Sequence, residues 1–228
     1  MKNIDIEKRK EEILNAHKFR FACKEFDPDR KISEEDFKFL LEVGRLSPSS
    51  FGFEPWKFLV VENEELREKL LPAVWGVRRQ MPTLSHLVII LARKGSEVIY
   101  SADYITHMMR DVHKMPDDKI KERREKYRVF QNEDFKIFNN EKDMFEWSIR
   151  QTYIALGNMM TAAAEIGIDS CPIEGFNKEE LEKLLESEGV LDREKFGVST
   201  LIAFGYRKEN PHREKTRRPM EDVVEWIK

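Results

Sequence analysis

Hydrophobic and polar positions follow helical spacing in some stretches and strand spacing in others, and the change between them is clearest from Leu46 to Val61. A helical apolar pattern ends there, because Pro48 lacks an N–H and has a fixed φ. A short serine-rich loop with Gly52 follows, and the chain then enters Phe58–Val61, a run typical of a buried strand. A tight polar loop between two buried elements favours a ligand site, although an ordinary helix-to-strand connection fits the same pattern.

Helical patterns lie on both sides of this stretch. Residues 4–18 predict a charged helix, Ser33 begins a capping box for a second helix, and Asn63 caps a third that runs to about Ala73. Asn177 caps a fourth. The side chains expected to face inwards are Ile4, Ile6, Ile13, Leu14 and His17 in the first helix and Phe37, Leu40, Leu41 and Gly44 in the second.

Unbroken apolar runs mark the centre of the fold. Leu87–Ala92 and Val198–Phe204 predict strands that are covered on both faces. The longest helical pattern extends from Glu141 to about Ile166, is apolar nearly all round and contains several small residues. We therefore expect this helix to be buried, either within one subunit or between two.

Residues 102–140 are rich in charge and predict helices that stand partly away from the core. Their aromatic residues either pack among themselves or face another apolar group. No linker interrupts the chain, so we expect one domain over residues 1–228. The apolar residues near the end require a surface to lie on, and they are Val223, Val224, Trp226 and Ile227.

Composition narrows the classes of partner. The 40 basic residues nearly balance the 43 acidic ones, and the net charge of -3 argues against nucleic acid or an anionic membrane. No run approaches the roughly 20 apolar residues of a membrane span, and the N-terminus has no apolar signal core. The two cysteines cannot build a disulfide framework. We expect a cytoplasmic protein.

Most catalytic motifs are missing from the sequence. No glycine-rich nucleotide cradle is present, the five histidines are not paired for a metal, and no serine lies in a nucleophile elbow. Cations near the two ends remain, with Arg20 and Lys24 at the start and Lys215 and Arg217 towards the end. If the ends meet, these side chains would bind a dianion; otherwise they are ordinary solvated charges.

Five separated segments, taken together and in order, resemble the FMN-dependent nitroreductase family, which includes oxygen-insensitive NAD(P)H nitroreductases and related flavin reductases. They are FRFACKEFD (19–27), LSPSSFGFEPWKFLVV (46–61), Gln151 to Asn158 of the long helix, Pro172 to Phe176, and EKTRRP (214–219). The resemblance implies an α+β fold with a mostly antiparallel central sheet flanked by helices. It also implies an intertwined homodimer with the long helix at its centre and two FMN sites across the interface.

The resemblance assigns roles to individual residues. Arg20, Lys215 and Arg217 match the phosphate site, and Lys24 matches the lysine at the polar edge of the isoalloxazine. The turn at Glu174 matches a backbone N–H that faces flavin N5, and the 48–50 loop matches one that arrives from the partner subunit. The cofactor-binding set is Arg20, Phe21, Ala22, Lys24, Pro48, Ser49, Ser50, Gly52, Gln80, Ile173, Glu174, Gly175, Lys215 and Arg217.

Three positions depart from the family pattern. Ala22 replaces a common serine, Gly52 a common asparagine, and Gln80 a second flavin-edge lysine, whose loss would shift the flavin potential or the donor preference. The aromatic residues of the loop and of the 102–140 segment suggest an apolar lid over a planar substrate. The residues assigned to this lid are Phe51, Phe53, Phe130 and Phe135.

The implied activity is hydride transfer from NADH or NADPH through flavin N5 to a nitroaromatic, quinone or free flavin, with ping-pong kinetics. No side chain is required as an acid or base, because the cofactor carries the chemistry. Other reactions on the same fold, such as flavin reduction or dehalogenation, are alternatives within the enzymes. A flavin-free dimeric scaffold is the alternative outside them.

Overall fold

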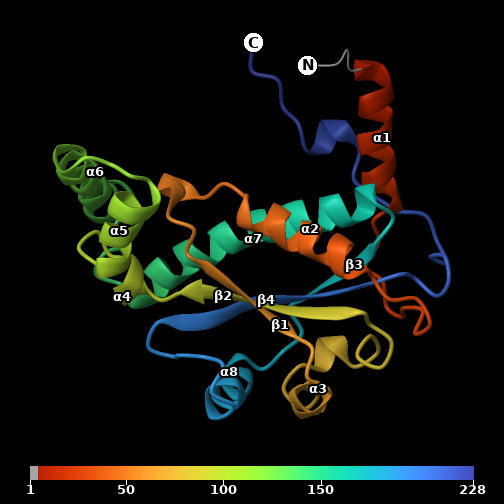
Figure 1. Ribbon diagram of the computed structural model, residues 1–228. Coiled ribbons are helices and arrows are strands. Elements are labelled where there is room, and N and C mark those ends of the chain that lie inside the picture. The colour runs from red at the N-terminus through yellow and green to blue at the C-terminus, as the bar shows by residue number, and fades with distance from the viewer. Residues whose placement is uncertain (1–4) are drawn as a thin grey trace.

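The computed structural model describes residues 5–228, and its centre is a four-stranded sheet with helices on both faces (Figure 1). The strand order is β1 (Trp56–Val61), β2 (His86–Arg93), β4 (Phe196–Gly205) and β3 (Asp169–Ile173). Each neighbouring pair is antiparallel. The fold is therefore α+β with an antiparallel sheet, which confirms the class that the sequence predicts.

Three of the four strands are the apolar runs seen in the sequence, and one was missed. β2 and β4 extend the predicted runs by one or two residues at their ends, and β1 begins two residues before Phe58. β3 was not predicted, because Pro172 lies in its middle. Proline is tolerated there because β3 is an edge strand whose ladder partner is β4 alone.

Side-chain caps begin several helices as predicted. Ser33, Asn63 and Asn177 accept the amides three residues on, at 3.1, 2.8 and 3.3 Å. Asn63 caps a helix that ends at Leu70, three residues before the predicted end. The helices outside the 102–140 segment are α1 (Ile6–Phe19), α2 (Glu34–Arg45), α3 (Glu64–Leu70), α4 (Gly95–Val98), α7 (Glu141–Glu165) and α8 (Lys178–Ser187), with 3-10 turns at Ser50–Gly52, Trp75–Val77 and Met220–Asp222.

Two apolar layers hold the sheet. On one face α2 and α7 cover Val88, Ile90 and Ile202, and on the other α3 and α8 cover Leu87 and Ile89 (Figure 1). The inward face of α2 is as predicted at Phe37, Leu40 and Gly44, which are buried, whereas Leu41 is half-buried. α7 matches the predicted helix, but Tyr153 and Ile154 on its outer side are exposed. One chain alone therefore does not bury α7 all round.

The predicted inward face of α1 is wrong. Ile6 is 63% and Leu14 is 59% exposed, Ile13 and His17 are exposed as well, and Ala16 is the buried residue of the helix. Ile4 lies outside the described residues. The reason is that α1 stands beside the end of α7 with its apolar side open (Figure 1). The C-terminal segment is open in the same way, with Trp226 81% exposed.

The predicted helical excursion, residues 102–140, stands to one side of the sheet (Figure 1). It contains α5 (Asp103–His107), a π turn at Met108–Val112, α6 (Asp117–Val129) and a second π turn at Phe130–Asp134. Tyr127 is fully buried at its centre and contacts Phe51, Phe53, Phe130 and Trp147. The aromatic residues here thus pack among themselves.

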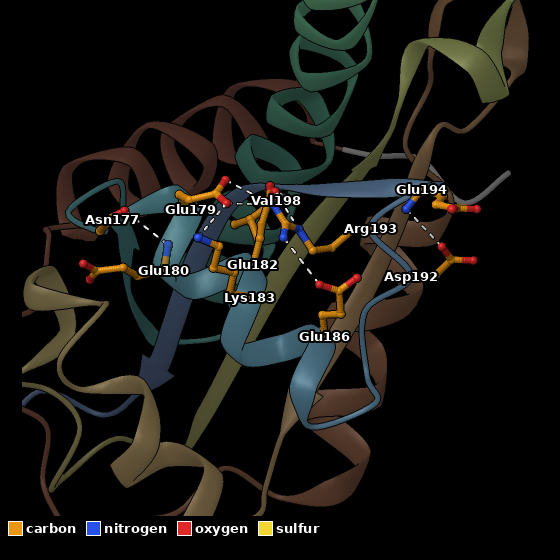
Figure 2. A network of polar contacts seen from close by, with 10 residues as sticks. All are labelled: Asn177, Glu179, Glu180, Glu182, Lys183, Glu186, Asp192, Arg193, Glu194 and Val198. Atoms are coloured by element: carbon orange, nitrogen blue, oxygen red, sulfur yellow. Dashed lines mark hydrogen bonds and ion pairs between the residues drawn. The ribbon is translucent and has the colours of Figure 1, made fainter.

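A polar network fixes α8 to β4 (Figure 2). The buried Glu182 carboxylate accepts the Val198 N–H at 2.8 Å and faces Arg193 Nε at 3.8 Å. Arg193 also pairs with the exposed carboxylates of Glu179 and Glu186. Glu182 therefore satisfies the amide of a buried strand residue.

We expect Glu182→Ala to lower the free energy of unfolding by about 2 kcal/mol, because it leaves the buried Val198 amide without an acceptor. Glu186→Ala is the matched control, since it removes an exposed partner of the same arginine and should cost under about 0.5 kcal/mol. Urea denaturation of both variants measures the difference. Equal losses in the two variants would contradict the importance of the Val198 hydrogen bond.

Candidate functional site

Segments from opposite ends of the sequence meet around a cavity of about 590 Å³. Residues 20–25 form one side and residues 207–213 and 215–217 the other, with Arg79 and Asp169 completing the lining. Isolated bridges join Phe26 to Arg207 and Ala22 to Ser170, which carry the first segment alongside the sheet. The sequence analysis predicts a dianion site only if the two ends of the chain meet, and in the structure they do meet.

A buried ion pair joins the two sides of the cavity. Asp169, 3% exposed at the start of β3, accepts the Arg207 backbone N–H at 2.9 Å and faces its guanidinium at 2.6 Å. The same guanidinium donates to the Phe19 carbonyl at 2.8 Å and lies over the Phe19 ring. Asp169 and Arg207 therefore hold the two sides of the cavity together. No local sequence motif indicated either residue.

Three of the cations that line the cavity have no carboxylate partner among residues 5–228. Arg20, Lys215 and Arg217 all line it, and none forms an ion pair within the part of the chain that the structure describes. Burial lowers the pKa of Lys215, and the charges of Arg20 and Arg217 lower it further. The Lys215 ammonium donates to the His17 carbonyl. Mutual repulsion of this kind is relieved by an anion placed among the three groups.

The floor of the cavity differs from the expectation at one position. Gln80 is 1% exposed, lies with its side-chain amide 3.4 Å from Cys171 Sγ, and is not part of the lining. Its neighbour Arg79 lines the cavity instead. Lys24 also lines it, with Nζ 3.6 Å from Cys171 Sγ. Burial raises the pKa of the Cys23 thiol to about 11, and Asp169 contributes.

The Glu174–Gly175 turn follows β3 directly. Gly175 accepts the Gly76 N–H at 2.7 Å, and a Cβ on Gly175 would lie 2.8 Å from the Trp75 ring and 2.9 Å from Gly76 Cα. Only glycine fits this approach. The Glu174 and Gly175 amides donate no hydrogen bond to any acceptor in residues 5–228. Two adjacent amide donors are thus left free, while Ile173 before them is buried.

Tyr153 of α7 lies beside this turn. Its hydroxyl donates to the Glu174 carboxylate. Burial raises the pKa of Tyr153 to about 12, and the hydrogen bond and charge of Glu174 add to the shift. The phenol therefore stays protonated near neutral pH and orients the Glu174 side chain.

The loop of residues 48–54 does not reach the cavity of its own chain. Its Ser50 amide donates to Gln151 of α7 at 2.8 Å, and the Ser49 hydroxyl accepts the Glu54 amide at 2.8 Å. Within one chain the structure therefore separates Pro48, Ser49, Ser50 and Gly52 from the cation site.

The four proposed lid residues have different environments. Phe53 is fully buried and forms part of the apolar core of the excursion, which corrects its assignment as a surface residue of a lid. Phe51 and Phe130 are half-buried with ring centroids 5.1 Å apart, and Phe135 is exposed over Phe130. An aromatic surface is therefore present at Phe51, Phe130 and Phe135.

Two further findings concern membranes and metals. Among residues 5–228, no helix combines the length and apolar character needed to cross a membrane. The same residues contain no group of three histidine, cysteine or carboxylate side chains placed to hold a metal ion.

The chain thus combines an α+β fold with a cation-lined cavity built from both of its ends, and comparisons with known proteins identify its family. The family model for the nitroreductase family matches residues 18–206, and the chain belongs to this family. YfkO of Bacillus subtilis (strain 168), provisionally named an NAD(P)H nitroreductase, is 52% identical over 218 residues, which cover 96% of this chain and 98% of YfkO.

Solved structures show the same fold at low sequence identity. The Bacillus subtilis protein ydfN, provisionally a nitroreductase, superposes with a TM-score of 0.75 at 20% identity and covers 97% of this chain and 100% of its own. A provisional nitroreductase from Exiguobacterium sibiricum, solved in complex with FMN, has a TM-score of 0.72 at 19% identity and covers 94% of this chain and 97% of its own. The relatives' names support an NAD(P)H-dependent oxidoreductase.

Proposed function

We propose that this chain is an FMN-dependent oxidoreductase that uses NADH or NADPH to reduce nitroaromatics, quinones or related planar acceptors. The observation that carries the proposal is the convergence of Arg20, Lys215 and Arg217, which have no carboxylate partner, in a cavity of about 590 Å³. A phosphate monoester carries close to two negative charges at neutral pH and matches this cluster. The complex of the Exiguobacterium sibiricum neighbour with FMN supports the choice of cofactor.

Two residues of the cavity, and the turn after β3 outside its lining, fit the rest of this cofactor. Lys24 and Arg79 supply positive charge on the side of the cavity formed by residues 20–25, where they would stabilise negative charge at the polar edge of a reduced flavin. The free amides of Glu174 and Gly175 would donate to a ring nitrogen. Bound FMN would supply hydride transfer between the nicotinamide and the acceptor. Both substrates would then use one pocket in turn, and we expect ping-pong kinetics.

The working form in this proposal is a homodimer. Apolar side chains on α1, on the outer side of α7 and in the C-terminal segment are exposed in one chain, namely Ile6, Leu14, Tyr153, Ile154, Trp226 and Ile227. A second copy is the partner that would cover them, and it would bring the 48–54 loop to the opposite cavity. A flavin-free scaffold is disfavoured, because its dimer surface needs no clustered cations.

The decisive experiment is an absorption spectrum of the purified protein before and after anaerobic addition of NADH or NADPH. Flavin bands that bleach are expected, and the faster donor identifies the physiological nucleotide. Size-exclusion chromatography with light scattering gives the oligomeric state on the same sample. A protein that is colourless and takes up no added FMN would refute the proposal.

A further inference from the structure

The loop of residues 49–54 is held in an unfavourable backbone conformation. Phe51 has φ +58° and Glu54 has φ +45°, and neither is glycine. Side chains with a Cβ rarely adopt the left-handed region, and they do so where surrounding contacts impose it. The loop therefore depends on what surrounds it.

The surrounding contacts come from the helical excursion. Three consecutive loop carbonyls each accept a hydrogen bond from it: Arg123 Nη2 donates to Phe51 at 3.3 Å, His113 Nε2 to Gly52 at 2.9 Å, and the Tyr104 hydroxyl to Phe53 at 2.7 Å. Because a carbonyl only accepts, the proton of His113 lies on Nε2. The three donors come from three separate segments of the excursion, and all three segments contribute to holding the loop.

Each donor is itself held in place. Arg93 stacks on the Tyr104 ring at 3.5 Å, and Arg123 lies over the Phe51 ring at 5.2 Å. His113 ends a π turn, with its own amide bonded to the Met108 carbonyl at 2.8 Å, and its ring stacks on Phe53. A π turn changes the direction of the following side chain, and such turns are frequent at functional sites. The three donors therefore hold the loop backbone at three consecutive carbonyls.

We propose that the excursion clamps the 49–54 loop in its strained conformation, with Tyr104, His113 and Arg123 as positioning residues for acceptor binding. The proposal rests on the proposed function at one point, because the loop faces an acceptor only when a second subunit presents it to the flavin pocket. The three residues act through the loop backbone and need not touch the acceptor themselves.

The first test measures the loop directly by hydrogen–deuterium exchange. The Gly52 and Glu54 amides are hydrogen-bonded to the Ser49 carbonyl and hydroxyl, so their exchange reports on the loop. We expect His113→Leu and Tyr104→Phe each to speed this exchange about fivefold, the factor for loss of one net hydrogen bond. His113→Gln, whose amide can donate to the Gly52 carbonyl, should restore the slow rate. His107→Leu is the matched control, because His107 pairs with Asp111 in the same excursion and leaves the loop untouched.

The second test is kinetic and separates acceptor binding from electron supply. In His113→Leu we expect the KM for a planar quinone to rise at least threefold, with kcat for ferricyanide, which takes electrons without filling the pocket, unchanged. Unchanged loop exchange in both variants would overturn the clamp. Faster exchange with an unchanged quinone KM would overturn the positioning role. Exchange is measured without added flavin, so a wild type that binds no FMN refutes the proposed function separately.

Discussion

Arg217→Ala should weaken FMN binding roughly tenfold to a hundredfold, because the proposed phosphate site would lose a charged hydrogen-bond donor. The same change removes one of three mutually repelling cations, so the flavin-free protein should melt at the same temperature or slightly higher. A fluorescence titration with FMN and a thermal melt of the apo protein measure the two effects on one sample. A loss of FMN affinity without a loss of apo stability is expected for a residue of an anion site. A structural arginine would lower the apo stability instead.

The adjacent Arg218 provides the control for this variant. It does not line the cavity, so Arg218→Ala should leave FMN affinity within about twofold of the wild type. Retention of full FMN affinity in Arg217→Ala would remove the phosphate from this cluster and would require another location for the cofactor.

Asp169→Ala should cost about 3 to 5 kcal/mol of unfolding free energy, since it leaves the Arg207 guanidinium buried without its counter-charge. Glu25→Ala is the matched control, because Glu25 pairs at 2.6 Å with Lys208 on the exposed rim of the same cavity. That pair is exposed to solvent, so its removal should cost much less than removal of Asp169. Urea denaturation of the two apo variants gives the comparison, and a loss below about 1 kcal/mol for Asp169→Ala would show that the buried pair does not anchor the site.

The parts of the fold that were predicted correctly depend on local signals. Ser33, Asn63 and Asn177 cap their own helices within three residues, and a central strand such as β2 has to be apolar on both faces. β3 was missed because Pro172 argues against a strand, and proline is tolerated there since β3 lies at the edge of the sheet. The inward face predicted for α1 was wrong, because amphipathic spacing shows which residues share a face but not whether another element covers that face.

In the candidate site too, some residues were predicted from the sequence and others were not. Arg20, Lys215 and Arg217 were identified by a family resemblance, and the structure brings them together. Gln80 was assigned to the cofactor by the resemblance, whereas the structure buries Gln80 and lines the cavity with its neighbour Arg79. The 3-10 and turn geometry there gives no periodic pattern from which this could be predicted. The positive φ values of Phe51 and Glu54 could not be predicted, because tertiary hydrogen bonds impose them on residues that do not favour them.

The two buried cysteines make the chain convenient for spectroscopic labelling. Both thiols are buried, and the raised pKa of Cys23 keeps it in the unreactive protonated form near neutral pH. A maleimide dye should therefore ignore the native protein and attach to one cysteine introduced at an exposed position such as Phe135. With a second cysteine introduced on an exposed position of the body, single-molecule distance measurements between excursion and body would need no removal of natural thiols.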